Sequence, residues 1–101
     1  MRKIKISPEY GVLPIWKQDS DGMFEDIDID DIELSFSEEL KTKITEWDDL
    51  FQKTLNQDYP PDSDFGSETE RQNFDQLGKI IFEEITEHLN GKFEVIYKSI
   101  I

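Results

Sequence analysis

The stretch 37–55, SEELKTKITEWDDLFQKTL, decides the fold class of this chain. Its apolar residues recur at steps of 4, 3, 4 and 4, at Leu40, Ile44, Trp47, Phe51 and Leu55. At about 100° per residue these side chains fall on one face, so the spacing predicts a helix from about 37 to 55. Ser35 and Glu38 have the spacing of a capping box, and Ser37 is a second candidate for the N-cap.

A second helix is predicted over about 67–90. Ser67 and Glu70 form another capping box, and Asn90-Gly91 is a typical C-terminal stop. The residues predicted to share its apolar face are Phe74, Leu77, Ile81, Phe82, Ile85 and Leu89. Gly78 lies on the same face, which predicts a close approach to a neighbouring element, whereas Ile80 lies off it and is assigned neither to the core nor to the surface.

Short strands flank the helical region. Residues 2–6 (RKIKI) and 93–97 (FEVIY) alternate, with Ile4 and Ile6 expected to face inward. Residues 12–17 (VLPIWK) form a second extended stretch, which we expect at a sheet edge because Pro14 cannot donate to a ladder. Asp19-Ser20-Asp21-Gly22 is a turn signal. We therefore predict an α+β fold, a single domain over 1–101, in which a small sheet joins the N- and C-terminal strands and the two helices cover one face.

The composition excludes several function classes. The 101 residues carry 24 acids and 11 bases, for a net charge of −13, which disfavours direct binding to nucleic acid or to an anionic membrane. There is no cysteine and only one histidine, His88, so thiolate and paired-histidine metal sites are excluded. No stretch has the roughly 20 apolar residues of a membrane span. We expect a cytoplasmic protein with a basic protein as its partner.

The most unusual segment is 19–39, which holds ten acids and no base. We expect it to be extended and kinked near Asp30-Asp31, with its carboxylates outward. The apolar residues expected to anchor it are Phe24, Ile27, Ile29, Ile32, Leu34 and Phe36. A solvated charged face is the simplest interpretation, but ten uncompensated acids repel one another, which solubility alone does not require. The segment therefore favours binding to a cationic surface.

Catalysis and metal binding are not predicted. With 24 carboxylates, some pair will have catalytic spacing by chance, and no glycine-rich phosphate loop is present. Counted from Asp26 as a calcium loop, position 6 is Asp31 rather than glycine and position 12 is Ser37 rather than glutamate. His88 is expected to be a helix-end histidine near C-terminal carbonyls. We expect no catalytic residue, no metal ligand and no cofactor.

Several strings together resemble small acidic immunity proteins of bacterial contact-dependent growth inhibition and polymorphic toxin systems. They are KISPEYGVLPIW, LSFSEELK, EWDDLFQKTLN, DYPPDSDFGS and FEVIY, and they span nearly the whole chain. The resemblance implies a cytoplasmic protein that binds and neutralises a toxin domain, often a nuclease. It assigns no residue to the contact.

From the residues, we predict a 1:1 complex with a basic toxin domain. The charged contact is assigned to Asp26, Asp28, Asp30, Asp31 and Glu33, and the aromatic anchors to Tyr59, Phe65, Tyr10 and Trp16. Blocking of the active site and binding at a distant exosite are both compatible with the sequence. The alternative is an acidic adaptor or nucleic-acid mimic that binds a host DNA- or RNA-binding protein.

Overall fold

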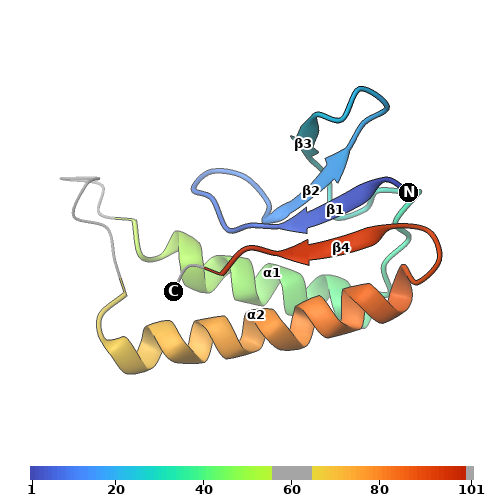
Figure 1. Ribbon diagram of the computed structural model, residues 1–101. Coiled ribbons are helices and arrows are strands. Elements are labelled where there is room, and N and C mark those ends of the chain that lie inside the picture. The colour runs from blue at the N-terminus through green and yellow to red at the C-terminus, as the bar shows by residue number, and fades with distance from the viewer. Residues whose placement is uncertain (56–64, 100–101) are drawn as a thin grey trace.

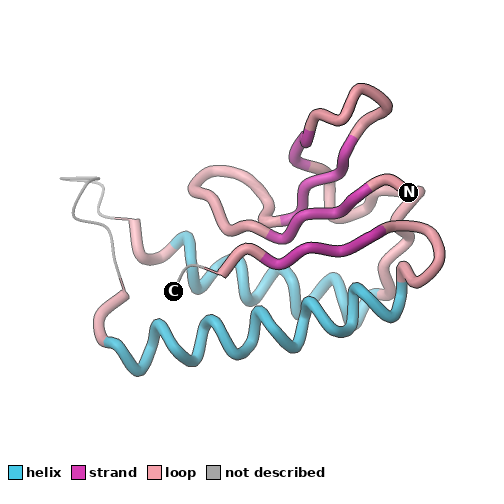
Figure 2. The backbone as a smooth tube through the Cα atoms, in the orientation of Figure 1, coloured by secondary structure: helices cyan, strands magenta, loops and turns pink. Residues whose placement is uncertain are grey.

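The structure is a computed structural model that describes residues 1–55 and 65–99. Its elements are, in chain order, β1 (Lys3–Ile6), β2 (Ile15–Gln18), β3 (Phe24–Asp26), α1 (Glu38–Gln52), α2 (Glu68–His88) and β4 (Glu94–Tyr97). The two helices lie on the same side of the sheet, and the β2–β3 hairpin projects from the opposite side (Figures 1 and 2). The α+β fold predicted from the sequence is confirmed.

The sheet has the strand order β3-β2-β1-β4. β1 pairs with β2 antiparallel and with β4 in parallel, so the N- and C-terminal strands are neighbours as predicted. The predicted edge position of the 12–17 stretch is wrong, because β2 lies between β1 and β3. Pro14 precedes the strand, and its carbonyl accepts the Ser7 N–H at 2.8 Å, so its missing donor falls outside the ladder.

Both helices begin at a predicted serine. Ser37 Oγ accepts the Leu40 N–H at 3.1 Å and Ser67 Oγ accepts the Glu70 N–H at 3.2 Å. Ser35 is not the cap of α1, since its φ of +49° places it in the left-handed region. α1 ends at Gln52, three residues before the predicted end, and α2 spans most of its predicted range.

The core lies between the sheet and the helices. Ile4, Ile6 and Ile15 pack with α1 and α2 side chains such as Trp47 and Ile85, all of them buried. The close approach predicted at Gly78 is confirmed, because a Cβ there would lie 2.5 Å from Tyr97 Oη and 2.7 Å from Trp47 Cζ2.

One predicted core residue of α2 is not in the core. Leu77 is 43% exposed, whereas Phe74 and Ile81 on the same helix are buried. The buried face of α2 centres on Gly78 and Ile85, and Leu77 lies at its rim beside α1. Its place on the apolar face of the sequence was therefore not sufficient for burial.

The acidic segment is not one extended strand. Only Phe24–Asp26 is β-strand, and turns follow at 29–30 and 32–34. The Asp28 and Asp31 side chains accept the backbone N–H groups of Asp30 and Leu34, which favours turns over extension. The segment is held by Leu34 and Phe36, both buried, whereas Ile32 is 93% exposed and is not the anchor that its position predicted.

Candidate functional site

Three of the five predicted contact carboxylates are bound to bases within the protein. Asp30 pairs with Lys41 at 2.9 Å, Asp31 with Lys17 at 2.8 Å, and Glu33 with both Arg2 and Lys17. These three acids, Asp30, Asp31 and Glu33, are called the tethered carboxylates below. Their partners come from α1, β2 and the N-terminus, so the ion pairs fasten the acidic segment to three other parts of the fold.

Asp31 is the most firmly held of the three. Its Oδ1 accepts the Leu34 N–H at 3.1 Å, and its carbonyl accepts the Ser35 N–H at 2.9 Å. Burial raises the pKa of Asp31, but the hydrogen bonds from Lys17 and the Leu34 backbone more than offset this, so the pKa lies below its ordinary value. Asp31 therefore stabilises the turn that places Leu34 in the core.

Lys17 lies between two carboxylates. Its Nζ is 2.8 Å from Asp31 Oδ2 and 3.3 Å from Glu33 Oε1, and the hydrogen bond to Asp31 raises the pKa of the ammonium group. The Arg2 hydrogen bond is the main reason that the pKa of Glu33 is lowered. Arg2, Lys17, Asp31 and Glu33 thus form one charged network.

Asp26 and Asp28 differ from the tethered carboxylates. Both are exposed, and within residues 1–55 and 65–99 no base lies within 4 Å of either carboxylate. Asp26 ends β3, opposite Trp16 in the β2–β3 register. Cross-strand partners share one face of a sheet, and Ile15 faces the core, so Trp16 and Asp26 share the face turned away from the helices.

Aromatic side chains accompany these acids. Lys5 Nζ lies 5.4 Å from the ring centroid of Trp16 and 4.9 Å from that of Phe24, and Trp16 Nε1 donates to the Ser7 carbonyl at 3.0 Å. The set Trp16, Phe24, Asp26 and Asp28 is called the hairpin surface below. Phe24 was expected to be an anchor in the core, but its register opposite Gln18 places it on the outer face. Pairing the two sides of the 19–22 turn would have shown this from the sequence.

The remaining predicted anchors lie elsewhere. Tyr10 stacks on Phe51 at 4.5 Å between ring centroids, and its hydroxyl lies 2.5 Å from Thr54 Oγ1. Phe65 packs against Phe74 at 5.1 Å. Both therefore belong to an aromatic cluster at the C-terminal end of α1 and the N-terminal end of α2, whereas Tyr59 lies outside the described residues.

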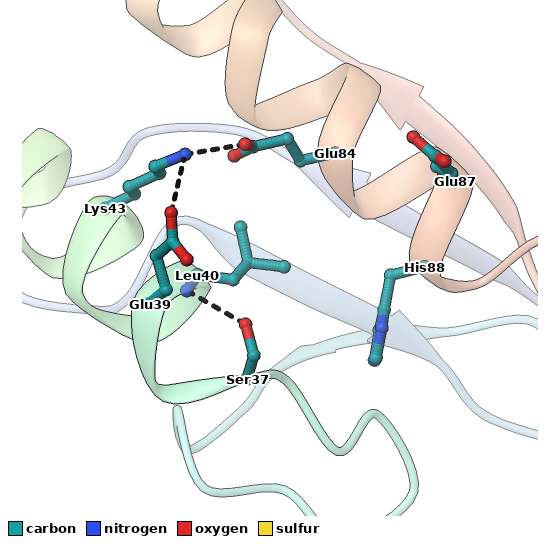
Figure 3. A pocket seen from close by; sticks show the side chains of 7 residues that line it. All are labelled: Ser37, Glu39, Leu40, Lys43, Glu84, Glu87 and His88. Atoms are coloured by element: carbon teal, nitrogen blue, oxygen red, sulfur yellow. Dashed lines mark hydrogen bonds and ion pairs between the residues drawn. The ribbon is translucent and has the colours of Figure 1, made fainter.

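A hollow of about 280 Å³ lies between the start of α1 and the end of α2 (Figure 3). At its rim Lys43 pairs with Glu84 at 2.6 Å and with Glu39 at 3.7 Å. His88 Nε2 lies 2.8 Å from the Leu34 carbonyl, so this histidine binds the acidic segment rather than the carbonyls of its own helix. Its contacts are accounted for by structure, and no nucleophile with an adjacent base is present in this hollow.

Two further searches concern metals and membranes. In the part of the chain that the structure describes, no three histidine, aspartate or glutamate side chains are placed to hold a metal ion. Over the same residues, no helix combines the length and the apolarity that crossing a bilayer requires.

Comparison with known proteins gives one result of weight. The family model described as Serratia CdiI immunity protein-like matches residues 2–100. A search of curated proteins finds no significant match. Because the family match covers nearly the whole chain, the protein belongs to the Serratia CdiI immunity protein-like family, and it is thereby an immunity protein of contact-dependent inhibition whose partner is a cognate toxin.

Proposed function

We propose that the protein neutralises a cationic toxin domain with nuclease activity by binding it through the hairpin surface in a 1:1 complex in the cytoplasm. Membership of the immunity family supports a toxin as the partner. The net charge of −13 supports a cationic one, because opposite charge speeds the encounter of two proteins. Immunity proteins of this kind are in general not enzymes, which agrees with a function in binding.

The observation that carries the proposal is the pairing of Trp16 with Asp26 across β2 and β3. A large aromatic ring beside carboxylates that no described base neutralises is the combination expected at the centre of an interface with a basic protein. A nuclease presents cations where it holds substrate phosphates, and the Asp26 and Asp28 carboxylates would take the place of those phosphates.

The tethered carboxylates have a different part in this proposal. Their ion pairs with Arg2, Lys17 and Lys41 hold the segment that follows Asp28, so less conformational entropy is lost on binding. We assign Asp30, Asp31 and Glu33 to positioning of the hairpin surface.

The size of the molecule is compatible with such a complex. Its accessible surface is 6488 Å², so a standard interface of about 800 Å² per partner would cover about an eighth of it. Tyr10 and Phe65 lie at the other end of the helices and stay at most peripheral contacts in this arrangement. A nucleic-acid mimic would need a longer row of free carboxylates, and the internal pairing of three acids argues against that alternative.

The proposal is tested by co-expression with the cognate toxin domain, followed by titration calorimetry of the purified pair. We expect cells to survive only when the protein is present, and the calorimetric stoichiometry to be one to one. A toxin with no nuclease activity would contradict the nuclease assignment, and equal killing with and without the protein would contradict neutralisation itself.

A further inference from the structure

The exposed side of the α1–α2 seam carries a groove that the hairpin surface does not involve. Three hollows follow the seam: the one in Figure 3, a middle one of about 180 Å³, and a third of about 280 Å³ near Leu50 and Gly66. The first two share Lys43. We call this feature the helix groove.

The middle of the helix groove is apolar. Leu77 and Ile80 line it and are 43% and 50% exposed, Trp47 forms its buried floor, and Leu50, one turn along α1 from Glu46, is 43% exposed. These aliphatic side chains come from facing sides of two helices, so they form a continuous patch rather than scattered single residues. An apolar patch with a charged rim is typical of a surface that a partner covers.

The charge around the helix groove restricts the partner. α1 contains five acids and two bases, and α2 contains six acids and two bases, so the two helices together carry −3 − 4 = −7. Two copies of this face would repel each other, which disfavours a second copy of the chain as the occupant. A cationic occupant would be attracted along the whole length of the seam.

We propose that the helix groove binds a basic amphipathic helix of a partner protein. Its apolar side chains would enter the middle hollow against Leu77 and Ile80, as in other helix-in-groove complexes. Its lysine or arginine side chains would lie toward the end where Glu39, Glu84 and Glu87 gather. Glu84 Oε2 is buried and accepts no hydrogen bond in the described structure, so it could accept one from such a cation.

This binding is independent of the proposed toxin contact. The helices and the β2–β3 hairpin lie on opposite sides of the molecule (Figure 1), and the hairpin surface faces away from the helices. Failure of one surface to bind therefore leaves the other untouched.

The test uses a labelled synthetic peptide of about 18 residues, with leucine at helical positions i, i+3, i+4 and i+7 and lysine elsewhere. Fluorescence anisotropy gives its Kd for the intact protein, and amide chemical shifts map where it binds. We expect the shifts to gather at Leu50, Leu77 and Ile80. In the double variant Leu77→Asp/Ile80→Asp the Kd should rise about 10-fold or more, because the apolar contacts are lost.

The direction of this change separates the helix groove from general attraction. The double variant adds two negative charges, so attraction by charge alone would make the cationic peptide bind more tightly. The matched control is Met23→Asp/Ile32→Asp, which adds the same charge at residues 65% and 93% exposed outside the groove. Its Kd should stay equal or fall.

A Kd that is unchanged or lower in Leu77→Asp/Ile80→Asp would overturn the proposal, as would shifts centred on Trp16 and Asp26. Both substituted side chains of this variant are about half exposed, so the variant should fold, and its thermal midpoint is measured as a check.

Discussion

Two neighbouring parts of the acidic segment have the same kind of sequence and different physical roles. Asp26 and Asp28 are exposed with no described base beside them, whereas Asp30, Asp31 and Glu33 are each bound to a lysine or arginine from elsewhere in the fold. With 24 acids and 11 bases, the positions of the few bases decide which carboxylates are free. A dense acidic sequence is thus not a uniform binding surface.

The difference also shows which mutations are informative. Reversing Asp28, Asp30 and Asp31 together would remove a proposed contact and two internal ion pairs at once, so a loss of protection would have two explanations. The two parts should be changed separately.

The largest effect is expected from Asp26→Lys/Asp28→Lys. This double reversal should weaken toxin binding by about 100-fold at low salt, because two attractive contacts become repulsive. The thermal midpoint should stay within a few degrees of wild type, because neither residue holds a base in the described structure. Calorimetric titration and a thermal melt measure the two quantities, and wild-type affinity in this variant would move the interface away from the hairpin surface.

The reverse pattern is expected for Asp31→Ala. It leaves Lys17 without its nearest partner and the Leu34 N–H without its acceptor, so the free energy of unfolding should fall by about 2 kcal/mol. Urea unfolding measures this, with Asp26→Ala as the matched control, for which we expect a change below about 0.5 kcal/mol. Equal losses in the two variants would remove the distinction between the two parts.

The pH dependence of stability should show the same contrast. The pKa of Asp31 is lower in the folded protein than its ordinary value of 3.8, so its ion pair stabilises fully above that value and is lost as the pH falls through the folded pKa. The difference in unfolding free energy between wild type and Asp31→Ala should therefore shrink below about pH 4, whereas that for Asp26→Ala stays small throughout. Urea unfolding at pH 7 and pH 3 checks this, and a gap that widens in acid would contradict it.

The smallest effect concerns salt. Toxin binding by wild type should weaken about 10-fold between 0.05 and 0.5 M salt, because exposed charges are screened. In Asp26→Asn/Asp28→Asn the slope should be shallower, while Asp30→Asn should keep most of it. Identical slopes in all three proteins would mean that the attraction comes from the overall charge rather than from the hairpin surface.

Much of the fold follows from local sequence. The apolar spacing in 37–55 and 67–90, the serine caps at Ser37 and Ser67, and the need for close approach at Gly78 all predicted what the structure contains. The β2 position was mispredicted, because a proline one residue outside a strand has no effect on its ladder. The site was predicted only as a group of acids, since no local signal shows which base from another element will reach a given carboxylate.

The sequence by itself determined the α+β class, both helices with their caps, the adjacent terminal strands and the strongly acidic character of the chain. These follow from periodicity and composition, which act over a few residues or over the whole chain. The tertiary structure alone decided that Lys17 binds Asp31 and Glu33, that Trp16 faces Asp26, and that Leu77 and Ile80 remain exposed. Each of these depends on strand register or helix packing between segments distant in sequence, and side-chain contacts at such range are fixed only when the chain has folded.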